Sequence, residues 1–320
     1  MTHSFAVEKG ISHSLQINLD IVVAMRCGDI HVNVQDAAGD RILAGDMLTR
    51  DDTRWNQWEK VKPQKLGQQY GEYYGAGQDE DVHDYLGAAR RKRRFPRTPY
   101  LRGGQPDACR IYGSIEGNKV QGDFHITARG HGYMEFTPHL DHNKFNFSHV
   151  INELSFGPFY PGLSNPLDNT RATTDFHFYK FQYYTSIVPT IYTTDAHNLK
   201  TLSPPKSILE GSQDVTPLSY SSQTVWTNQY AVTEQSHSIG ESLVPGIFVK
   251  YDIEPLLLLV SEEWGGFFPL IVRLINVVSG VLVAGTWCWQ LSDWAFDTFG
   301  KRDGRAREGF LGTGSTEKHV

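Results

Sequence analysis

The sequence predicts a mainly β protein, in which a large antiparallel β-sandwich is followed by one transmembrane α-helix. Segments rich in aromatic and β-branched residues recur between Gly and Pro breaks, without intervening helical repeats, which is typical of a β-sandwich. One apolar run, Phe267–Trp289, has 23 residues. Because an α-helix rises about 1.5 Å per residue, this run reaches across the roughly 30 Å hydrocarbon core of a bilayer.

The first strands are marked by alternation of apolar and polar residues. The alternating apolar positions are Leu15, Ile17, Leu19, Ile21 and Val23 and, after a break at Cys27-Gly28, Ile30, Val32 and Val34. Successive side chains of a strand point to opposite faces. The pattern therefore predicts two strands that each bury one face.

Residues 46–107 read differently, as a long and weakly ordered insertion. They hold an acidic stretch at 79–84 and the basic run RRKRRFPR at 90–97, and Trp55 and Trp58 predict one short helix that buries a side chain. A basic run can mark nucleic-acid binding or a localisation signal, but no further basic surface surrounds this one. We expect a solvated loop and no nucleic-acid partner; pairing with the acidic stretch and a proteolytic site are the alternatives.

From Cys109 onward the sequence is dominated by predicted strands. Residues 116–118 (EGN) give a hairpin-like turn signal between two of them. The segments rich in aromatic and β-branched residues are 110–115, 119–127, 146–157, 174–194, 224–236 and 246–263. Together with the first strands, they predict one large β domain.

The apolar run Phe267–Trp289 has a single charge, Arg273, near its start. Tryptophans stand before the run and at and beyond its end, as in the aromatic belts of two membrane interfaces. A buried helix of a large globular core is the alternative. We expect a β-rich domain over 1–266, a membrane helix over 267–289 and a tail over 290–320.

Charges on the two sides of the run predict its orientation. Glu262 and Glu263 precede it, and the basic residues that follow it are Lys301, Arg302, Arg305, Arg307 and Lys318. The positive-inside rule then places the tail in the cytosol and the large domain across the membrane. The chain opens without an apolar signal sequence, so we expect an N-terminal piece that starts translocation to be missing from it.

Two of the three cysteines, Cys27 and Cys109, lie outside the apolar run, and Cys288 lies within it. Two is the number that one disulfide needs, and a disulfide requires an oxidising compartment. A pair of reduced core cysteines is the alternative, and the residues themselves leave both open.

Six stretches taken together resemble the endoplasmic-reticulum vesicle protein family, also called the ER–Golgi intermediate compartment proteins. They are QINLDIVVAMRC (16–27), ACRIYGSIEGNKVQGDFHIT (108–127), NFSHVINELSFG (146–157), NPLDN (165–169), FQYYTSIVPT (181–190) and PGIFVKYDIEPLLLLVSEE (245–263). The resemblance runs from about residue 5 to the end of the apolar run, interrupted by the insertion. Asn169 departs from the family, which usually has Gly there, but Asn also tolerates a left-handed turn.

The resemblance implies the smaller subunit of a hetero-oligomeric cargo receptor, because the larger subunit carries a cysteine-rich lumenal segment. Family members have a first membrane helix, a lumenal β-rich domain, a second membrane helix and a cytosolic tail, and this sequence begins where the lumenal domain would begin. They travel from ER to Golgi in COPII vesicles, return in COPI vesicles and retrieve escaped ER residents. The resemblance also implies a Cys27–Cys109 disulfide.

Histidines supply the candidate site of the β domain. His139, His142 and His149 surround Asp141, and such a cluster can bind a metal, but Pro138, Asp141 and Asn143 indicate a solvated loop. We expect no metal and no cofactor. Imidazole titrates across the pH range from ER to Golgi, so we hypothesise a pH sensor for cargo binding. Its candidate residues are His125, His131, His139, His142 and His149.

Catalysis finds no support, because nucleophile-elbow, zinc-protease, P-loop and dinucleotide-binding motifs are all missing from the sequence. We expect a non-enzymatic receptor subunit that binds lumenal cargo through sheet faces and loops. A lumenal enzyme or chaperone carried in the vesicles is the alternative from another class. A structural adaptor for the larger subunit, without cargo binding of its own, is the third.

Three smaller features complete the sequence predictions. Asn146-Phe147-Ser148 is a glycosylation sequon. In the apolar run, Gly280 and Ala284 with the polar Asn276 mark a face that another helix can approach closely. In the tail, the candidate signals for vesicle coats are Phe310, Leu311 and Val320, and an ordinary solvated tail is the alternative.

Overall fold

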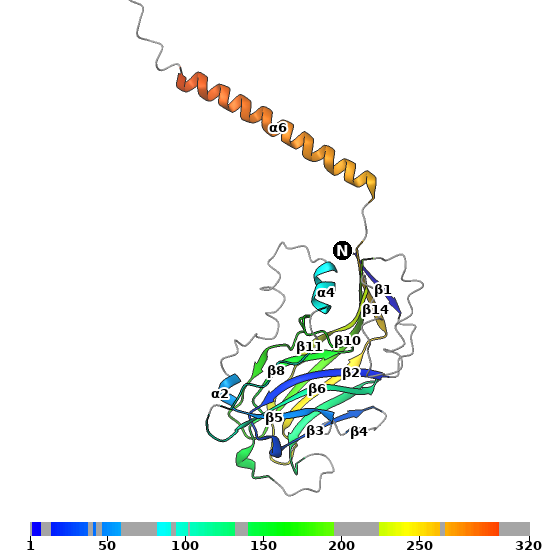
Figure 1. The fold of residues 1–320 in the computed structure, drawn as a ribbon, viewed down its shortest axis with the longest axis vertical. Helices are drawn as coiled ribbons and strands as arrows, with labels where there is room; N and C mark the ends of the chain where they lie inside the picture. The colour runs from blue at the N-terminus through cyan, green and yellow to red at the C-terminus, as the bar shows by residue number, and fades with distance from the viewer. Residues whose placement is uncertain are drawn as a thin grey trace, which may run out of the picture. The chain divides into compact units, whose positions relative to one another are not determined.

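The computed structural model describes residues 2–7, 14–37, 41–42, 47–58, 82–90, 94–101, 103–131, 140–194, 224–262 and 266–300. The chain forms two compact units, Met1–Glu263 and Trp264–Val320. The first is a β unit (Figure 1) and the second contains one long helix. Among the candidate site residues, His139, Phe310, Leu311 and Val320 lie outside the described residues, and so do the basic residues after Gly300 that predict the orientation.

The strands are β1 (Thr2–Val7), β2 (Ser14–Val23), β3 (Ile30–Asp36), β4 (Arg41–Ile42), β5 (Thr49–Thr53), β6 (Ala108–Asn118), β7 (Gly122–Ala128), β8 (His149–Phe156), β9 (Thr170–Ala172), β10 (Tyr179–Thr193), β11 (Thr224–Glu234), β12 (His237–Ser238), β13 (Gly246–Ile253) and β14 (Leu256–Ser261). The helices are η1 (Cys27–Asp29), α2 (Trp55–Trp58), α4 (Val82–Ala89), η2 (His142–Lys144) and α6 (Phe267–Gly300).

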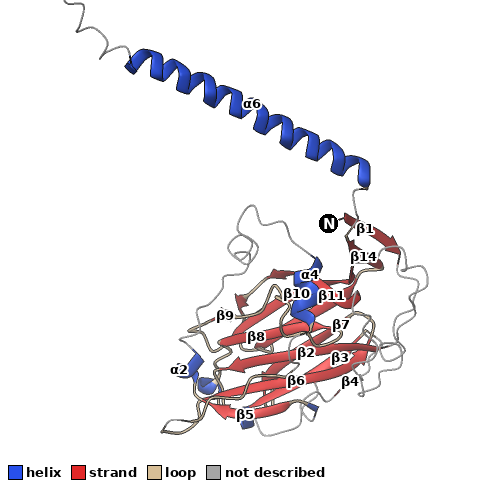
Figure 2. Cartoon of the chain, turned by 45° about the horizontal axis from the view of Figure 1, so that its top comes forward, coloured by secondary structure: helices blue, strands red, loops and turns tan. Residues whose placement is uncertain are grey.

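All these strands belong to one curled sheet (Figure 2), whose main order is β4-β3-β7-β13-β10-β11-β8-β2-β6-β5. Buried side chains from both halves of this order meet in a single core, so the sheet supplies both layers of the predicted sandwich. The pairing is antiparallel except that β13 and β14 run parallel to β10. The parallel pairs were not predicted: after β11 the chain returns through β12 to the start of β10, so β13 runs in the same direction as β10.

The inner face of the sheet is apolar, as the alternation in the first strands predicted. In β2, Leu15, Ile17, Leu19, Ile21 and Val23 are all buried, and β3 buries Ile30, Val32 and Val34. Their partners in the core come mainly from β6, β7, β8, β10 and β13. The outer face of β2 is buried as well, although it carries Asn18 and Asp20.

The predicted insertion at 46–107 is more ordered than we expected in the parts that the structure describes. β5 pairs with β6, and α4 packs on Tyr192, Val225 and Val260. α2 buries Trp58, as the sequence predicted. Of the expected solvated loop at 90–97, residues 91–93 lie outside the described residues, and Arg94, Pro96 and Arg97 are exposed; Phe95 departs from the expectation, because it is half-buried and stacks on Phe159. Strand pairing and apolar contacts with distant segments order these residues in spite of their local composition.

The second unit contains the apolar helix that the sequence predicted. α6 begins at Phe267, as expected, and the part of it that is long and apolar enough to cross a membrane is Phe267–Phe296, with a mean hydropathy of 2.1. It therefore extends beyond the expected end at Trp289.

Candidate functional site

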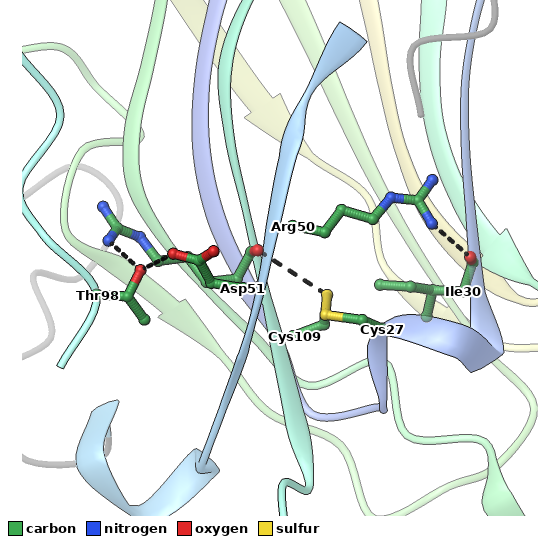
Figure 3. The surroundings of a disulfide bond; sticks show 7 residues. Cys27, Ile30, Arg50, Asp51, Thr98 and Cys109 are labelled. Carbon is green, nitrogen blue, oxygen red and sulfur yellow. Dashed lines mark hydrogen bonds between the residues drawn. A yellow bond between two sulfur atoms is a disulfide. The ribbon is translucent and has the colours of Figure 1, made fainter. Parts of the chain in front are cut away.

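The disulfide closes a seam between the two ends of the curled sheet. β3 lies near one end of the strand order, and β6 and β5 lie at the other. Cys27, in the η1 turn that leads to β3, is bonded to Cys109 in β6, and Figure 3 shows the bridge beside β5. On the same seam, the Arg50 guanidinium of β5 donates a hydrogen bond of 3.5 Å to the carbonyl oxygen of Ile30. The predicted bridge therefore fastens strands that do not neighbour one another in the sheet.

Two of the predicted histidines meet at the end of the sheet where β8 and β10 begin. His131 follows β7, His142 lies in η2, and their Nε2 atoms are 2.9 Å apart. Both rings contact the Phe145 ring, and the His142 ring also meets Phe178 edge-on. We call these four residues the His–Phe cluster. The other end of β10 pairs with β14, after which the chain leads to α6.

The histidine pair holds its proton in a defined place. His131 Nδ1 lies 3.3 Å from the carbonyl oxygen of Arg129, which can only accept, so Nδ1 carries the hydrogen. The neutral His131 ring then accepts at Nε2, and His142 donates from its own Nε2. This hydrogen bond exists while at most one of the two rings is charged, because two imidazolium rings at this distance repel.

His125 and His149, the other predicted histidines that the structure describes, do not join this pair. His149 is buried, donates from Nδ1 to the carbonyl oxygen of Phe147 and accepts from the Tyr183 hydroxyl, each at 2.9 Å. Burial lowers its pKa to about 4, so His149 stays neutral from ER to Golgi and is a poor pH sensor. His125 is buried on β7, where it stacks on Phe248.

A metal site is not formed by the histidines in the described part of the chain. No group of three or more His, Cys, Asp or Glu side chains there is placed to hold an ion. Asp141 instead caps η2, where its carboxylate accepts from the backbone N–H of Asn143 at 3.1 Å. Asp141, the acid that lies among the histidines in the sequence, is therefore occupied by a backbone hydrogen bond.

The sequon asparagine, Asn146, is exposed just before β8 begins. Its neighbours Phe145 and Phe147 are buried. The strand itself starts three residues later, at His149, because Asn146 forms a turn in which its side-chain oxygen accepts from the backbone N–H of Ser148.

A buried polar array covers the outer face of β2, β6 and β8, and the sequence analysis did not predict it. Arg110 and Asp20 are 0% and 1% exposed. The guanidinium donates from Nε to Asp20 Oδ1 at 2.8 Å and from Nη2 to Asp20 Oδ2. It also donates to the carbonyl oxygen of Pro96 and to the Thr98 hydroxyl, both at 2.9 Å. The segment that ends the basic run is thus the cover of this ion pair.

Two more carboxyl groups lie next to the ion pair. Glu153 stands opposite Asp20 in the β2–β8 register, beside an irregularity that leaves Asn152 as an extra residue in β8. Asp168 lies in the NPLDN turn and accepts from the backbone N–H groups of Leu154 and Asn165, at 3.0 and 2.8 Å. Burial raises the pKa of both carboxyl groups, and the Asp168 carboxylate raises that of Glu153 further.

In α6, the predicted contact face is formed by Asn276, Gly280 and Ala284, which lie four residues apart and therefore on one side of the helix. All three are exposed. A side chain added at Gly280 would meet open space. Cys288 and Ser292 continue the same line of small and polar residues.

Comparison with known proteins relates this whole architecture to one family. The family model described as endoplasmic reticulum vesicle transporter matches residues 101–288, and the model described as Endoplasmic Reticulum-Golgi Intermediate Compartment (ERGIC) matches residues 1–43. The chain belongs to the endoplasmic reticulum vesicle transporter family. Membership confirms the resemblance of the six stretches and places the protein in ER–Golgi vesicle transport.

Relatives in this family cover most of the chain. The human endoplasmic reticulum-Golgi intermediate compartment protein 2 is 31% identical over 88% of this chain and 71% of its own length. The ER-derived vesicles protein ERV41 of Saccharomyces cerevisiae is 31% identical over 92% of this chain and 78% of its own length. A solved structure, "Crystal Structure of Erv41p", is similar with a TM-score of 0.53 and 28% identity, over 82% of this chain and 100% of that chain.

The family stretches hold both the disulfide and the outer polar array. Cys27, Asp20, Arg110, Glu153 and Asp168 all lie within them. Asn169 has a φ of 55°, so the residue that departs from the family adopts the left-handed turn that Asn tolerates. One sequence signal could have revealed the array: an Asp and an Arg lie in predicted strands whose other face is apolar. If both faces of such strands are covered, the two charged side chains must pair with each other.

Proposed function

We propose that this chain is a non-catalytic subunit of a cargo receptor that cycles between ER and Golgi and helps to retrieve ER-resident proteins. The family match, which covers residues 1–43 and 101–288 and so most of the β unit and of α6, carries the proposal. The β unit lies in the lumen and the C-terminus in the cytosol. The basic residues after α6 support this orientation, and the Cys27–Cys109 bridge fits an oxidising lumen.

Its partner is the larger subunit of the same receptor family. A relative of another kind, the ER-derived vesicles protein ERV46 of Saccharomyces cerevisiae, is 27% identical over 56% of this chain. The face of α6 at Asn276, Gly280 and Ala284 contacts a second membrane helix, because Asn276 needs a polar partner in lipid. Phe310, Leu311 and Val320 are the candidate contacts for COPII and COPI coats.

Cargo binds at the His–Phe cluster and responds to pH there. Retrieval requires binding in the more acidic compartment and release in the more neutral one. Protonation of both His131 and His142 breaks their hydrogen bond, and the aromatic surface beside them becomes positively charged and rearranges. A glycan at the exposed Asn146 would stand near this cluster, beyond the buried Phe145.

Co-purification from detergent-solubilised membranes tests the proposal. We expect the tagged chain to recover ER-resident proteins and the larger subunit at pH 6, and to recover less of the ER residents at pH 7.4. The double variant His131→Gln with His142→Gln should abolish the pH difference while the larger subunit is still recovered. His237→Gln, at an exposed position, is the matched control. His149 is not used as the control because it is buried. If cargo recovery by the double variant still depends on pH, the His–Phe cluster is not the pH-sensitive site. If every variant of the β unit recovers as much cargo as the unchanged chain, the chain is an adaptor that does not bind cargo itself.

A further inference from the structure

The outer polar array holds more negative charge than its bases can match. Its acids are Asp20, Glu153 and Asp168, and its base is Arg110, whose guanidinium is bonded to Asp20 through both carboxylate oxygens. Asp20 also accepts from the Asn152 amide at 3.1 Å. In the described part of the chain, Glu153 and Asp168 form no ion pair with a basic side chain, and the charges that act on Glu153 are the carboxylates of Asp168 and Asp20.

These two unmatched acids lie where a loop meets the sheet. The Asn165 amide donates to Asp168 Oδ2 at 3.0 Å and approaches Glu153 Oε1 at 3.5 Å, so it bridges the two carboxyl groups. The Leu167 backbone N–H donates to the Tyr230 hydroxyl, which in turn donates to the carbonyl oxygen of Leu154. Residues 163–169 are thus seated on β8 and β11 by polar contacts, several of which end on one carboxyl pair, and by the Leu167 side chain, which is buried in the core.

We propose that Glu153 and Asp168 form a proton-operated latch, in which a proton held by the pair keeps residues 163–169 seated on β8 and its loss releases them. Two carboxylates beside each other in a low-dielectric site cannot both ionise without strong repulsion. When the proton leaves, the repulsion is relieved by moving Asp168 and its turn away from Glu153. Asp20 adds to the repulsion, and the nearest base, Arg110, is already matched.

The direction of the response follows from the raised pKa of both groups. A carboxyl group whose pKa is raised by folding favours the folded arrangement while it is protonated, and this contribution is lost as the pH rises through the raised pKa. The latch is therefore closed at the more acidic pH and loosens as the pH rises. This window lies above the ordinary carboxyl range near pH 4. The latch is a property of the β unit and does not depend on the receptor role proposed above.

Release of residues 163–169 should also affect the neighbouring helix α4. Gly162 lies so close to α4 that an added Cβ would stand 2.4 Å from the carbonyl oxygen of Ala88. A shift of residues 163–169 therefore changes the support of α4, and a surface made by both segments differs between the acidic and the neutral state.

Hydrogen–deuterium exchange of the full chain in detergent micelles, from pH 6 to pH 9.5 and corrected for the intrinsic exchange rate, tests the latch. We expect protection of peptides within 154–170 to fall by up to tenfold per pH unit in the upper part of this range, the limit for one linked proton. Glu153→Gln keeps a neutral side chain whose oxygen still accepts from Asn165, so protection should stay high and independent of pH.

A second variant acts in the opposite direction. Asp168→Asn places an amide against three N–H donors, so protection of the same peptides should be low at every pH. Glu116→Gln, a half-buried carboxyl of β6 away from the pair, is the matched control and should follow the unchanged chain. Protection that does not vary with pH in the unchanged chain, or an equal pH slope in Glu153→Gln, would overturn the proposal.

Discussion

The two faces of β2 are both buried, but they are stabilised by different physics. The inner face contributes Leu19 and its apolar neighbours to the core, and this burial is favourable whatever the charge state of the protein. The outer face contributes Asp20, whose burial is tolerated because Arg110 is bonded to it. The comparison teaches that one strand can carry both a pH-independent and a charge-dependent share of the stability. Four substitutions separate the two shares.

The largest effect is expected on the outer face. Arg110→Met removes the base and leaves Asp20 buried without its partner, which should lower the free energy of unfolding by about 3–5 kcal/mol. Urea unfolding of the β unit, followed by near-ultraviolet circular dichroism in detergent, measures this. Adding Asp20→Leu should recover most of the loss, because an apolar pair needs no charge partner. A loss below about 0.5 kcal/mol would mean that the outer face behaves as ordinary solvated surface.

The inner face should lose slightly less and should not respond to pH. Leu19→Ala removes buried methyl groups from the core and should cost about 2–5 kcal/mol, equally at pH 5.5 and pH 8. The same unfolding measurement applies. Leu256→Ala, at an exposed position of β14, is the matched control and should change the free energy by less than about 0.5 kcal/mol. A pH-dependent cost at Leu19 would erase the distinction between the faces.

A smaller effect, of the opposite sign, is expected for Glu153→Gln. At pH 8 the folded native chain must keep a proton on Glu153 that the unfolded chain has lost, so the variant should gain on the order of 1–2 kcal/mol; at pH 5.5, closer to the ordinary carboxyl pKa, the gain should be smaller. Thermal unfolding at the two pH values compares them. A gain of equal size at both pH values would show that the effect does not come from the proton.

The smallest effect is expected where the cover meets the ion pair. Thr98 accepts from Arg110 and donates to the Asp51 carboxylate, so Thr98→Val should cost about 1 kcal/mol in urea unfolding. Thr98→Ser keeps the hydroxyl and should behave nearly as the unchanged chain. If Thr98→Val left the free energy of unfolding unchanged, the segment would cover Arg110 without stabilising it.

The sequence allowed the inner face to be predicted, because period-two alternation in β2 and β3 reports which positions an apolar core selects. It also gave the start of α6, since the apolar run follows directly from the thickness of a bilayer. The outer array escaped prediction because polar residues at alternate positions normally face water. Only the approach of distant segments, Pro96–Thr98 and the NPLDN turn, buries them.

The same limit explains the other differences. β5 and α4 have weak local signals and are ordered by contacts with β6 and with Tyr192. The parallel pairing of β10 with β13 depends on the route of the chain through β12. The local sequence of the two strands does not indicate their relative direction. The contact between His131 and His142 depends on which strand ends lie together in the fold, which the local sequence does not show. The family resemblance, in contrast, lies in short stretches that the sequence shows directly.

The seam disulfide joins Cys27 to Cys109, two residues that are 82 positions apart in the sequence. A single cut of the backbone anywhere inside this closed ring, including within the basic run at 90–97, yields two fragments that stay covalently joined. The amino-terminal fragment keeps β2 and the carboxy-terminal fragment keeps β6, and these strands pair along their whole length. A nicked molecule would thus migrate as one species until it is reduced.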